Sequence, residues 1–194
     1  YTGWYTLSLH DALPIFMRVL VTGGAGFIGS HIVDGLVERG HSVSVVDNLS
    51  SGRRENVNPA ARLHVADVTS NELGRIMEEE RPEVVFHEAA QMDVRKSVAD
   101  PRFDATVNIL GGLNLYEECI RLKVRKVVLA STGGAIYGEQ ETYPAPETHP
   151  QQPLSPYGIA KLANEKYLYF YKNTYGLEHV ILRYANVYGP RQSP

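Results

Sequence analysis

Hydrophobic residues are grouped in six short runs, each about the length of a β-strand. Within a run the apolar side chains follow one another, without the alternation of apolar and polar positions that a half-exposed strand shows. Continuous runs of this kind are typical of parallel strands whose two faces are both covered. We therefore expect strands at residues 16–21, 42–46, 62–65, 83–87, 125–130 and 178–183.

Stretches with the apolar spacing of an α-helix lie between these runs. In the first of them, residues 27–39, the side chains of Ile28, Ile32 and Leu36 fall on one face. Gly40 follows, and glycine is common just after the end of a helix. Further helices are expected at residues 70–80, 101–122 and 156–175.

The alternation of strands and helices predicts the fold class. A chain in which the two alternate throughout is expected to form a doubly wound α/β fold around a parallel sheet. The second helix should begin at Ser70, whose hydroxyl suits an N-cap, and should end before Pro82. No repeat or linker divides residues 17–194, so we expect one domain there. Residues 138–155 form the longest irregular stretch, and loops of this length often carry function.

The first sixteen residues do not share this pattern. A signal peptide would need a positive start and an unbroken apolar stretch, but His10, Asp11 and Pro14 interrupt this one. Residues 6–15 resemble the translation of a common sequencing-library adapter, and a short pro-segment or tag is the alternative. We expect residues 1–16 to be a non-native leader, exposed or loosely packed, and the domain to begin at Met17.

The segment TGGAGFIG, residues 22–29, follows the first expected strand and opens the first expected helix. In a dinucleotide-binding turn of this spacing, Gly23 would let the chain turn sharply and Gly26 would let the backbone approach a pyrophosphate. Gly29 would let the helix pack closely on the sheet. The N-terminus of the helix then offers N–H groups to the phosphates. Glycine also suits any tight strand-to-helix turn, so the motif needs independent support.

Asp47 supplies that support. It ends the second expected strand, about 20 residues after Gly26, where a carboxylate can accept both hydroxyls of an adenine ribose. The same charge would repel a 2′-phosphate, which favours NAD over NADP. Arg53 and Arg54 lie close enough to keep the NADP alternative open. Asp67, after the third expected strand, is either an adenine contact or an ordinary turn aspartate.

Tyr157 and Lys161 are candidate catalytic residues. They are four residues apart on an expected helix and therefore lie on one face. A lysine cation is expected to lower the pKa of the phenol, so that tyrosinate becomes accessible as a proton acceptor near neutral pH. The same ammonium can bind a nicotinamide ribose. Ser131 and Thr132 follow the fifth expected strand, where a hydroxyl could orient a sugar oxygen toward Tyr157, and both stay candidates.

Composition argues against several other classes of function. The net charge of −3 and the pI of about 6.2 give no basic surface for nucleic acid. No apolar run approaches the ~18 residues of a membrane span. The single cysteine, Cys119, cannot form an internal disulfide and is expected to be a small core residue, which is compatible with a reducing compartment.

These motifs together resemble the extended short-chain dehydrogenase/reductase family, which contains the NAD-dependent epimerases and dehydratases. The resemblance covers residues 17–194 and runs in the family's order through TGGAGFIG, DNLSSG, FHEAAQ, TVNILGGLN, STGGAIYG, SPYGIAK and LRYANVYGPRQ. Within the family, the chain looks like the enzymes that invert carbon 4 of UDP-glucose and UDP-galactose. The resemblance implies a Rossmann fold, bound NAD, a nucleotide-sugar substrate, a 4-keto intermediate and a cytoplasmic homodimer, with neither nucleic acid nor membrane as a partner.

The resemblance also implies roles for individual residues. The catalytic set would be Tyr157, Lys161 and one or both of Thr132 and Ser131, and the substrate would contact Thr132, Tyr157 and Asn186. No metal is implied. The residues implied to bind the cofactor are Gly23, Gly26, Phe27, Ile28, Gly29, Asp47, Asn48, Leu49, Ser51, Gly52, Asp67, Val68, Ala89, Ala90, Gln91, Asn108, Tyr157 and Lys161.

The sequence departs from the family pattern in two places. Gly133 stands where some relatives have the catalytic hydroxyl, which leaves Thr132 as the nearest candidate. In the family, a smaller C-terminal domain that grips the substrate nucleotide follows, and this sequence ends before it. We therefore expect this chain alone to bind NAD weakly and to show negligible turnover.

Other functions stay open at this point. A UDP-glucuronate epimerase or decarboxylase would differ mainly beyond residue 194. A nucleotide-sugar 4,6-dehydratase needs an acid and a base after Thr132, where the sequence has Gly133, Gly134 and Ala135. A non-catalytic NAD sensor would have no need of the pair formed by Tyr157 and Lys161. The chain as given could also be an inert fragment of an active enzyme.

Overall fold

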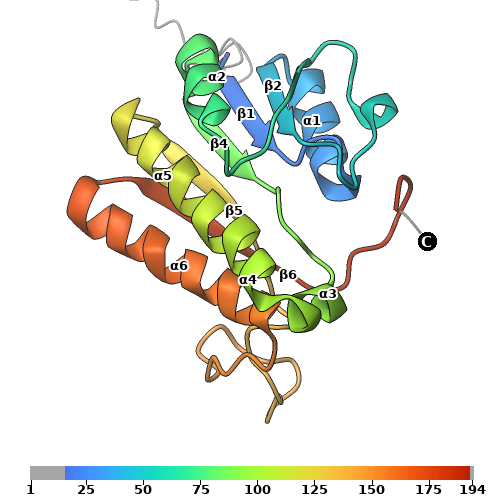
Figure 1. Ribbon diagram of the computed structural model, residues 1–194, viewed down its shortest axis with the longest axis vertical. Coiled ribbons are helices and arrows are strands. Elements are labelled where there is room, and N and C mark those ends of the chain that lie inside the picture. Colours follow the sequence, from blue (N-terminus) through green and yellow to red (C-terminus); the bar gives the residue numbers. More distant parts are fainter. Residues whose placement is uncertain (1–15, 193–194) are drawn as a thin grey trace, which may run out of the picture.

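A computed structural model describes residues 16–192 and contains one six-stranded sheet. All adjacent strands are parallel, in the order β3-β2-β1-β4-β5-β6. The strands are β1 (Arg18–Thr22), β2 (Ser42–Asp47), β3 (Arg62–Val65), β4 (Val84–His87), β5 (Lys126–Thr132) and β6 (Glu178–Tyr184). The predicted doubly wound α/β fold is confirmed, and the carboxyl ends of the strands share one edge of the sheet, where ligands bind in such folds (Figure 1).

Helices cover both faces of the sheet (Figure 1). On one face, α2, α5 and α6 bury Leu73, Leu115 and Leu168 against the strands. On the other face, α1 buries Val33 against valines of β1 and β2. The helical segments are α1 (Phe27–Glu38), η1 (Arg54–Asn56), α2 (Glu72–Glu80), α3 (Val94–Ala99), α4 (Pro101–Ala105), η2 (Thr106–Leu110), α5 (Gly111–Arg121) and α6 (Pro156–Tyr175).

The two outer strands differ from the pattern that the sequence predicts. The four inner strands are largely buried, as continuous apolar runs require. In β6, by contrast, exposed and half-buried residues alternate, and Val180 and Leu182 are exposed. The expectation that every strand is covered on both faces is therefore wrong for β6 and β3, because each is an edge strand with part of its surface uncovered by the described residues.

The predicted start of α2 is also wrong. The helix begins at Glu72, and Asn71 occupies the N-cap position without a side-chain hydrogen bond. Ser70 does not cap it, because its hydroxyl donates to the Asp67 carbonyl at 2.8 Å instead. The helix ends at Glu80, before Pro82 as predicted, and its C-cap residue Arg81 adopts a left-handed conformation with φ of 47°.

The single helix predicted over residues 101–122 is divided in three. Between α4 and α5 the chain widens into a π-helical segment, η2, which holds Asn108. A short helix that the sequence did not predict, α3, precedes α4, and Asp93 and Asp100 cap these two helices through their carboxylates. Single π turns often occur at functional sites, and Asn108 proves to bridge two parts of the candidate site.

Most of the expected leader, residues 1–15, lies outside the described residues. Phe16 is exposed, and β1 begins at Arg18, one residue after the Met17 that packs against the core. Among the helices that the structure describes, none combines the length and the apolar character that a membrane crossing requires.

Candidate active site

The turn between β1 and α1 requires glycine at two positions. Gly23 has a φ of 72°, and a Cβ atom there would lie 2.6 Å from the amide nitrogen of Ala89. A Cβ at Gly29 would lie only 2.2 Å from the carbonyl oxygen of Gly23. Gly23 therefore lets the chain turn sharply where it passes close to Ala89. Gly29 lets α1 pack closely against the turn. Both positions are ones at which the spacing of the motif predicts glycine.

The N-terminus of α1 is open to an anion. Gly26 is its N-cap, none of the side chains that the structure describes caps it, and its first turn contains no acidic residue. A Cβ at Gly26 would meet only the Gly23 carbonyl oxygen, at 3.2 Å, so its other side is unobstructed. The first N–H groups of the helix at Phe27 and Ile28 are thus available, and the arrangement fits a pyrophosphate.

Asp47 lies against this turn, at the end of β2. Its carboxylate accepts hydrogen bonds from the amides of Ala25 at 3.0 Å and Leu49 at 2.8 Å, and the residue is buried. A Cβ at Gly52 would come within 2.9 Å of both carboxylate oxygens, so the loop closes over Asp47 only because residue 52 is glycine. An ionised carboxylate has about four lone-pair sites, and two amide donors leave acceptor capacity for a ribose.

Asn48 and Asp67 are brought together beyond Asp47. The Asn48 amide donates to the Asp67 carboxylate at 2.8 Å, and Thr69 donates to Asp67 through both its amide and its hydroxyl. Burial raises the pKa of Asp67, but these hydrogen bonds outweigh it and hold the pKa below its usual value. Asp67 is thus a turn aspartate in this structure, and its contact with adenine stays a prediction, as do those of the neighbouring Val68 and Ser51.

Asn108 links the chain after β4 to the π turn. The Gln91 amide donates to Asn108 Oδ1 at 2.8 Å, and Asn108 Nδ2 donates back to the Gln91 carbonyl at 2.9 Å. Asp104 accepts from both side-chain amides at 3.0 Å. The Ala89 amide bonds the Thr22 hydroxyl at 3.3 Å, so the segment that contains Ala90 is held at both ends. Asn108 thus fixes the chain after β4 to the π turn, and its contact with the cofactor stays a prediction.

Lys161 is a buried cation beside Tyr157. Its ammonium donates to the Ala130 carbonyl at 2.9 Å and lies 5.8 Å from the centre of the Tyr157 ring. Burial lowers the pKa of Lys161 to about 8, although the nearby Glu88 and Asp104 carboxylates favour the charged form. The predicted proximity of lysine and tyrosine on one helix face is confirmed.

The predicted effect of this proximity on Tyr157 is not seen in this structure. Burial raises the pKa of Tyr157 above its usual value, and the charge of Asp104 raises it further. A buried phenolate loses solvation, and the Lys161 ammonium is directed at the Ala130 carbonyl. Both effects, burial and the Asp104 charge, hold the pKa of the Tyr157 phenol above that of a free tyrosine.

The structure distinguishes the two candidate hydroxyls. Ser131 and Thr132 are the last residues of β5, not the first residues after it. The Ser131 hydroxyl is buried and donates to Glu165 at 2.6 Å, whereas Thr132 is half-buried and only accepts a hydrogen bond, from the Ala135 amide at 3.2 Å. The Ala135 carbonyl in turn lies 2.6 Å from the Cβ position of Gly158, next to Tyr157. Ala135, which bonds Thr132, therefore lies against the first turn of α6, and among the described residues the Thr132 hydroxyl proton has no acceptor.

Two acidic residues at the site were not predicted. Glu88 directly follows β4, and its Oε1 atom is enclosed without a hydrogen-bond partner among residues 16–192. Burial raises the pKa of Glu88 to about 7, against the opposing effects of Lys161 and of a hydrogen bond from Tyr184. Asp104 is buried as well, and no described residue bonds its Oδ2 atom. Its position directly after the fourth expected strand was the available signal for Glu88.

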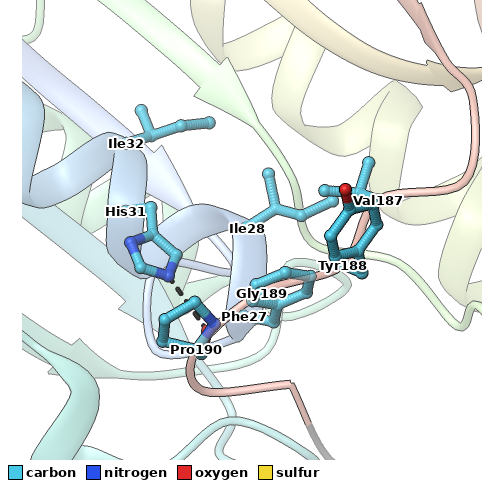
Figure 2. A pocket seen from close by; sticks show the side chains of 8 residues that line it. All are labelled: Phe27, Ile28, His31, Ile32, Val187, Tyr188, Gly189 and Pro190. Carbon is cyan, nitrogen blue, oxygen red and sulfur yellow. Dashed lines mark hydrogen bonds between the residues drawn. The ribbon is translucent and has the colours of Figure 1, made fainter.

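Asn186 lies in the exposed segment that follows β6. The same segment borders an apolar pocket of about 440 Å³ beside the start of α1 (Figure 2). His31 bonds the Pro190 carbonyl at 3.0 Å, and Arg191 pairs with Asp34 at 2.7 Å, so the segment is fastened to α1. The pocket is lined by Phe27, Ile28, His31, Ile32, Val187, Tyr188, Gly189 and Pro190. The contact of Asn186 with a nucleotide-sugar stays a prediction.

No group of three or more His, Cys, Asp or Glu side chains that could hold a metal ion was found within residues 16–192.

Comparison with known proteins gives consistent matches. Residues 19–194 match the family described as the NAD dependent epimerase/dehydratase family. A UDP-glucose 4-epimerase of Mycolicibacterium smegmatis is 49% identical over 183 residues, which cover 92% of this chain and 58% of that protein. The chain thus spans little more than half the length of such relatives.

Two solved structures are similar in both fold and sequence. The UDP-glucose 4-epimerase of Thermus thermophilus, solved as a complex with NAD, superimposes with a TM-score of 0.90 at 56% identity and covers 92% of this chain. The Thermotoga maritima UDP-glucose 4-epimerase, solved with UDP-glucose, gives a TM-score of 0.90 at 54% identity and covers 91%. This chain covers 58% of each of the two.

Proposed function

The chain belongs to the NAD dependent epimerase/dehydratase family, and from this premise we propose that residues 17–194 form the NAD-binding and catalytic domain of an enzyme that interconverts UDP-glucose and UDP-galactose. The convergence of Lys161, Tyr157 and Thr132 at the edge of the sheet beside an open phosphate-binding turn carries the proposal. The names of the relatives, at identities of 49–56%, support this choice of substrate.

The glycine turn and Asp47 would hold NAD. The N–H groups of α1 would bind the pyrophosphate, and Asp47 would accept the hydroxyls of the adenine ribose. Asn108 would keep the segment of Ala89, Ala90 and Gln91 in place on the nicotinamide side. When bound, NAD would supply the acceptor and donor of the hydride.

Three side chains would handle the sugar. Thr132 would bond the 4-hydroxyl oxygen and orient it, and the Tyr157 phenol oxygen would exchange a proton with that hydroxyl. The sugar proton can leave only if the Tyr157 pKa falls from its raised value when the site is filled, and the buried Lys161 cation is the group placed to lower it. The 4-keto sugar would then turn over and be reduced on its other face.

The decisive assay is the conversion of UDP-galactose to UDP-glucose, with UDP-glucuronate and dTDP-glucose tested in parallel. The relatives are longer, so we propose that turnover needs the remaining length that they have. The assay is therefore run on residues 17–192 joined to the C-terminal part of the Thermus thermophilus enzyme, and on the 194-residue chain. Turnover of dTDP-glucose alone, to a 4-keto-6-deoxy product, would contradict the epimerase proposal, although Gly133, Gly134 and Ala135 provide no acid or base for that elimination.

We also propose that the enzyme is a homodimer that works in the cytoplasm. Exposed apolar side chains lie on α4, η2 and α6, which pack against one another, and a second copy would cover them. They are Phe103, Leu110, Ile159, Tyr167 and Phe170. Sedimentation velocity tests this proposal directly: a monomer at micromolar concentration would contradict it, and Phe170→Ser should weaken the dimer.

A further inference from the structure

Two consecutive turns of α6 bind neighbouring residues at the end of β5. Lys161 donates to the Ala130 carbonyl at 2.9 Å, and the next residue, Ser131, donates to Glu165 at 2.6 Å. Both side chains of α6 are buried, and their spacing of four residues places them on one face. The preceding turn of that face carries Tyr157. Two fixed contacts between a helix and a strand determine how far the helix is shifted along the strand.

Arg183 holds Glu165 in place from the neighbouring strand. Its guanidinium donates to Glu165 at two points, 3.0 Å from Nε and 2.7 Å from Nη2. Arg183 is the partner of Ser131 in the β5–β6 ladder, so all three groups meet at one level of the sheet. The exposed fractions of the side chains are 19% for Arg183 and 6% for Glu165. A buried carboxylate is held firmly by this combination of a two-point guanidinium and a hydroxyl.

The same guanidinium reaches the long irregular loop. Arg183 Nη1 donates to the Tyr137 hydroxyl at 2.8 Å and to the Glu147 carbonyl at 3.3 Å. Tyr137 precedes residues 138–155, Glu147 lies among them, and α6 begins directly after them. The strand that carries Thr132, the helix that carries Tyr157 and the loop between them are therefore joined at Arg183.

We propose that Ser131, Glu165 and Arg183 form a positioning clamp, which sets Tyr157 against Thr132 and does not itself touch the sugar. The Ser131 hydroxyl proton and both carboxylate oxygens of Glu165 are bonded within this group, and both residues are buried. The clamp therefore assigns Ser131 a supporting role and leaves Thr132 as the catalytic hydroxyl. This inference rests on the proposed function of Tyr157 and Thr132.

The molecule contains a matched control. Lys172 and Glu178 also join α6 to β6, at 2.9 Å, but their side chains are about half exposed and lie at the far end of the helix. Exposed pairs of this kind contribute little to stability. Glu178→Gln should therefore leave both the position of Tyr157 and the rate of turnover unchanged.

The first test needs no turnover and uses the 194-residue chain. With ¹³C-labelled tyrosine, the resonance of Tyr157 is assigned through Tyr157→Phe, and that of Tyr167, further along α6, serves as the reference. Ser131→Ala should move the Tyr157 resonance and leave that of Tyr167 in place, because the ion pair that stabilises the helix is kept. Glu178→Gln should move neither. If Ser131→Ala leaves the Tyr157 resonance where it is, the clamp is disproved.

The second test uses the chain joined to the C-terminal part of the Thermus thermophilus enzyme. Ser131→Ala should lower kcat about tenfold, because misplaced reacting groups slow the chemical step, and should change KM by less than about twofold. Glu165→Gln should lower kcat further, but it removes a buried partner of Arg183 and can unfold the domain. Ser131→Ala, which keeps that pair, is therefore the deciding variant.

Two outcomes of this second test would overturn the clamp. An unchanged kcat in Ser131→Ala would mean that the hydrogen bond of Ser131 does not position the reacting groups. A loss as large as that of Thr132→Ala would mean that Ser131 acts on the sugar itself. If the unmodified protein does not convert UDP-galactose at all, the proposed function fails, and the Tyr157 resonance still decides whether the clamp exists.

Discussion

On the β2 side of β1, the candidate site is made mostly of backbone: the amides of α1, the turn at Gly23 and the loop that Gly52 allows around Asp47. On the β5 side it is made of side chains, which come from separate elements and reach one another only in the folded chain. Ser131, Glu165 and Arg183 are an example, with contacts of 2.6–3.0 Å between residues 18 or 34 positions apart.

This difference indicates how each half tolerates change. Only a substitution to proline removes a backbone donor, so the β2 side should fail mainly through steric clashes, when a side chain enters space that only glycine leaves free. The β5 side should fail through lost hydrogen bonds and charges, often without loss of the fold. The predictions below test this division, from the largest expected effect to the smallest.

Gly29→Ala should have the largest effect. The new methyl group would overlap the Gly23 carbonyl oxygen, which lies 2.2 Å from its position, so the turn must open. We expect NAD affinity to fall more than about a hundredfold and the free energy of unfolding to fall by about 2 kcal/mol or more. Calorimetry and urea unfolding measure the two effects. Gly35→Ala in the same helix is the control, because its methyl group would meet only the flexible Arg39 side chain at 3.2 Å.

Asp47→Asn should narrow the preference for NAD over NADP. The amide keeps the shape of the side chain but loses the charge that repels a 2′-phosphate, and we expect NAD to bind about ten- to a hundredfold more weakly. NADP should be affected less. Calorimetry with both nucleotides measures the difference in affinity, and Glu55→Gln, at an exposed position of the nearby η1, should not change it. Equal affinities in the unmodified chain would instead assign Arg53 or Arg54 to the 2′-phosphate.

Glu88→Gln should change how stability depends on pH. The pKa of Glu88 is raised to about 7 by burial, so between pH 4.5 and 7 the folded chain keeps a proton that the unfolded chain releases. Stability from this group is therefore present at low pH and is lost as the pH rises through about 7. The free energy of unfolding of the unmodified chain should decrease between pH 5 and pH 8. In Glu88→Gln this decrease should be smaller by about 1 kcal/mol or more.

Urea unfolding at both pH values measures this difference. Glu139→Gln, at an exposed position, should leave the fall unchanged. If the free energy of unfolding decreases equally between pH 5 and pH 8 in Glu88→Gln and in the unmodified chain, the enclosed carboxyl does not titrate near neutral pH.

Removal of residues 1–16 should have the smallest effect. The β1 strand begins at Arg18, Phe16 is exposed, and Met17, which packs against the core, is kept. We expect the free energy of unfolding to change by less than about 1 kcal/mol, the scale of a single lost contact. A larger loss in urea unfolding would show that this segment belongs to the domain.

The sequence predicts the features that depend on neighbouring residues better than those that depend on distant contacts. The α6 helix was predicted with its observed bounds because its signals are local: Ser155 caps it, Pro156 opens it and Gly176 follows it with a φ of 76°. The glycine turn was predicted for the same reason. Ser70 was predicted wrongly because the Asp67 carbonyl competes for its hydroxyl, a contact that depends on the shape of the turn.

The rest depends on distant contacts. The π turn at Asn108 coincides with a pair of hydrogen bonds to Gln91, which is 17 residues away. The apolar spacing of a helix does not predict such a turn. The choice between Ser131 and Thr132 could not be made from the sequence, because successive residues of a strand face opposite ways and only the folded chain places Glu165 beside Ser131. Glu88 and Asp104 were missed because burial, and not residue type, makes them unusual.

Our account assigns NAD binding mainly to the β2 side of the site and proton transfer to the β5 side. The variant Tyr157→Phe tests this assignment most directly. In the chain extended to the length of its relatives, we measure the NAD dissociation constant by calorimetry and the conversion of UDP-galactose to UDP-glucose. The account predicts NAD affinity within about threefold of the unmodified protein and turnover lower by about 10³-fold or more, because only the proton-handling oxygen is removed. Full turnover in Tyr157→Phe, or turnover and NAD binding lost together, would contradict it.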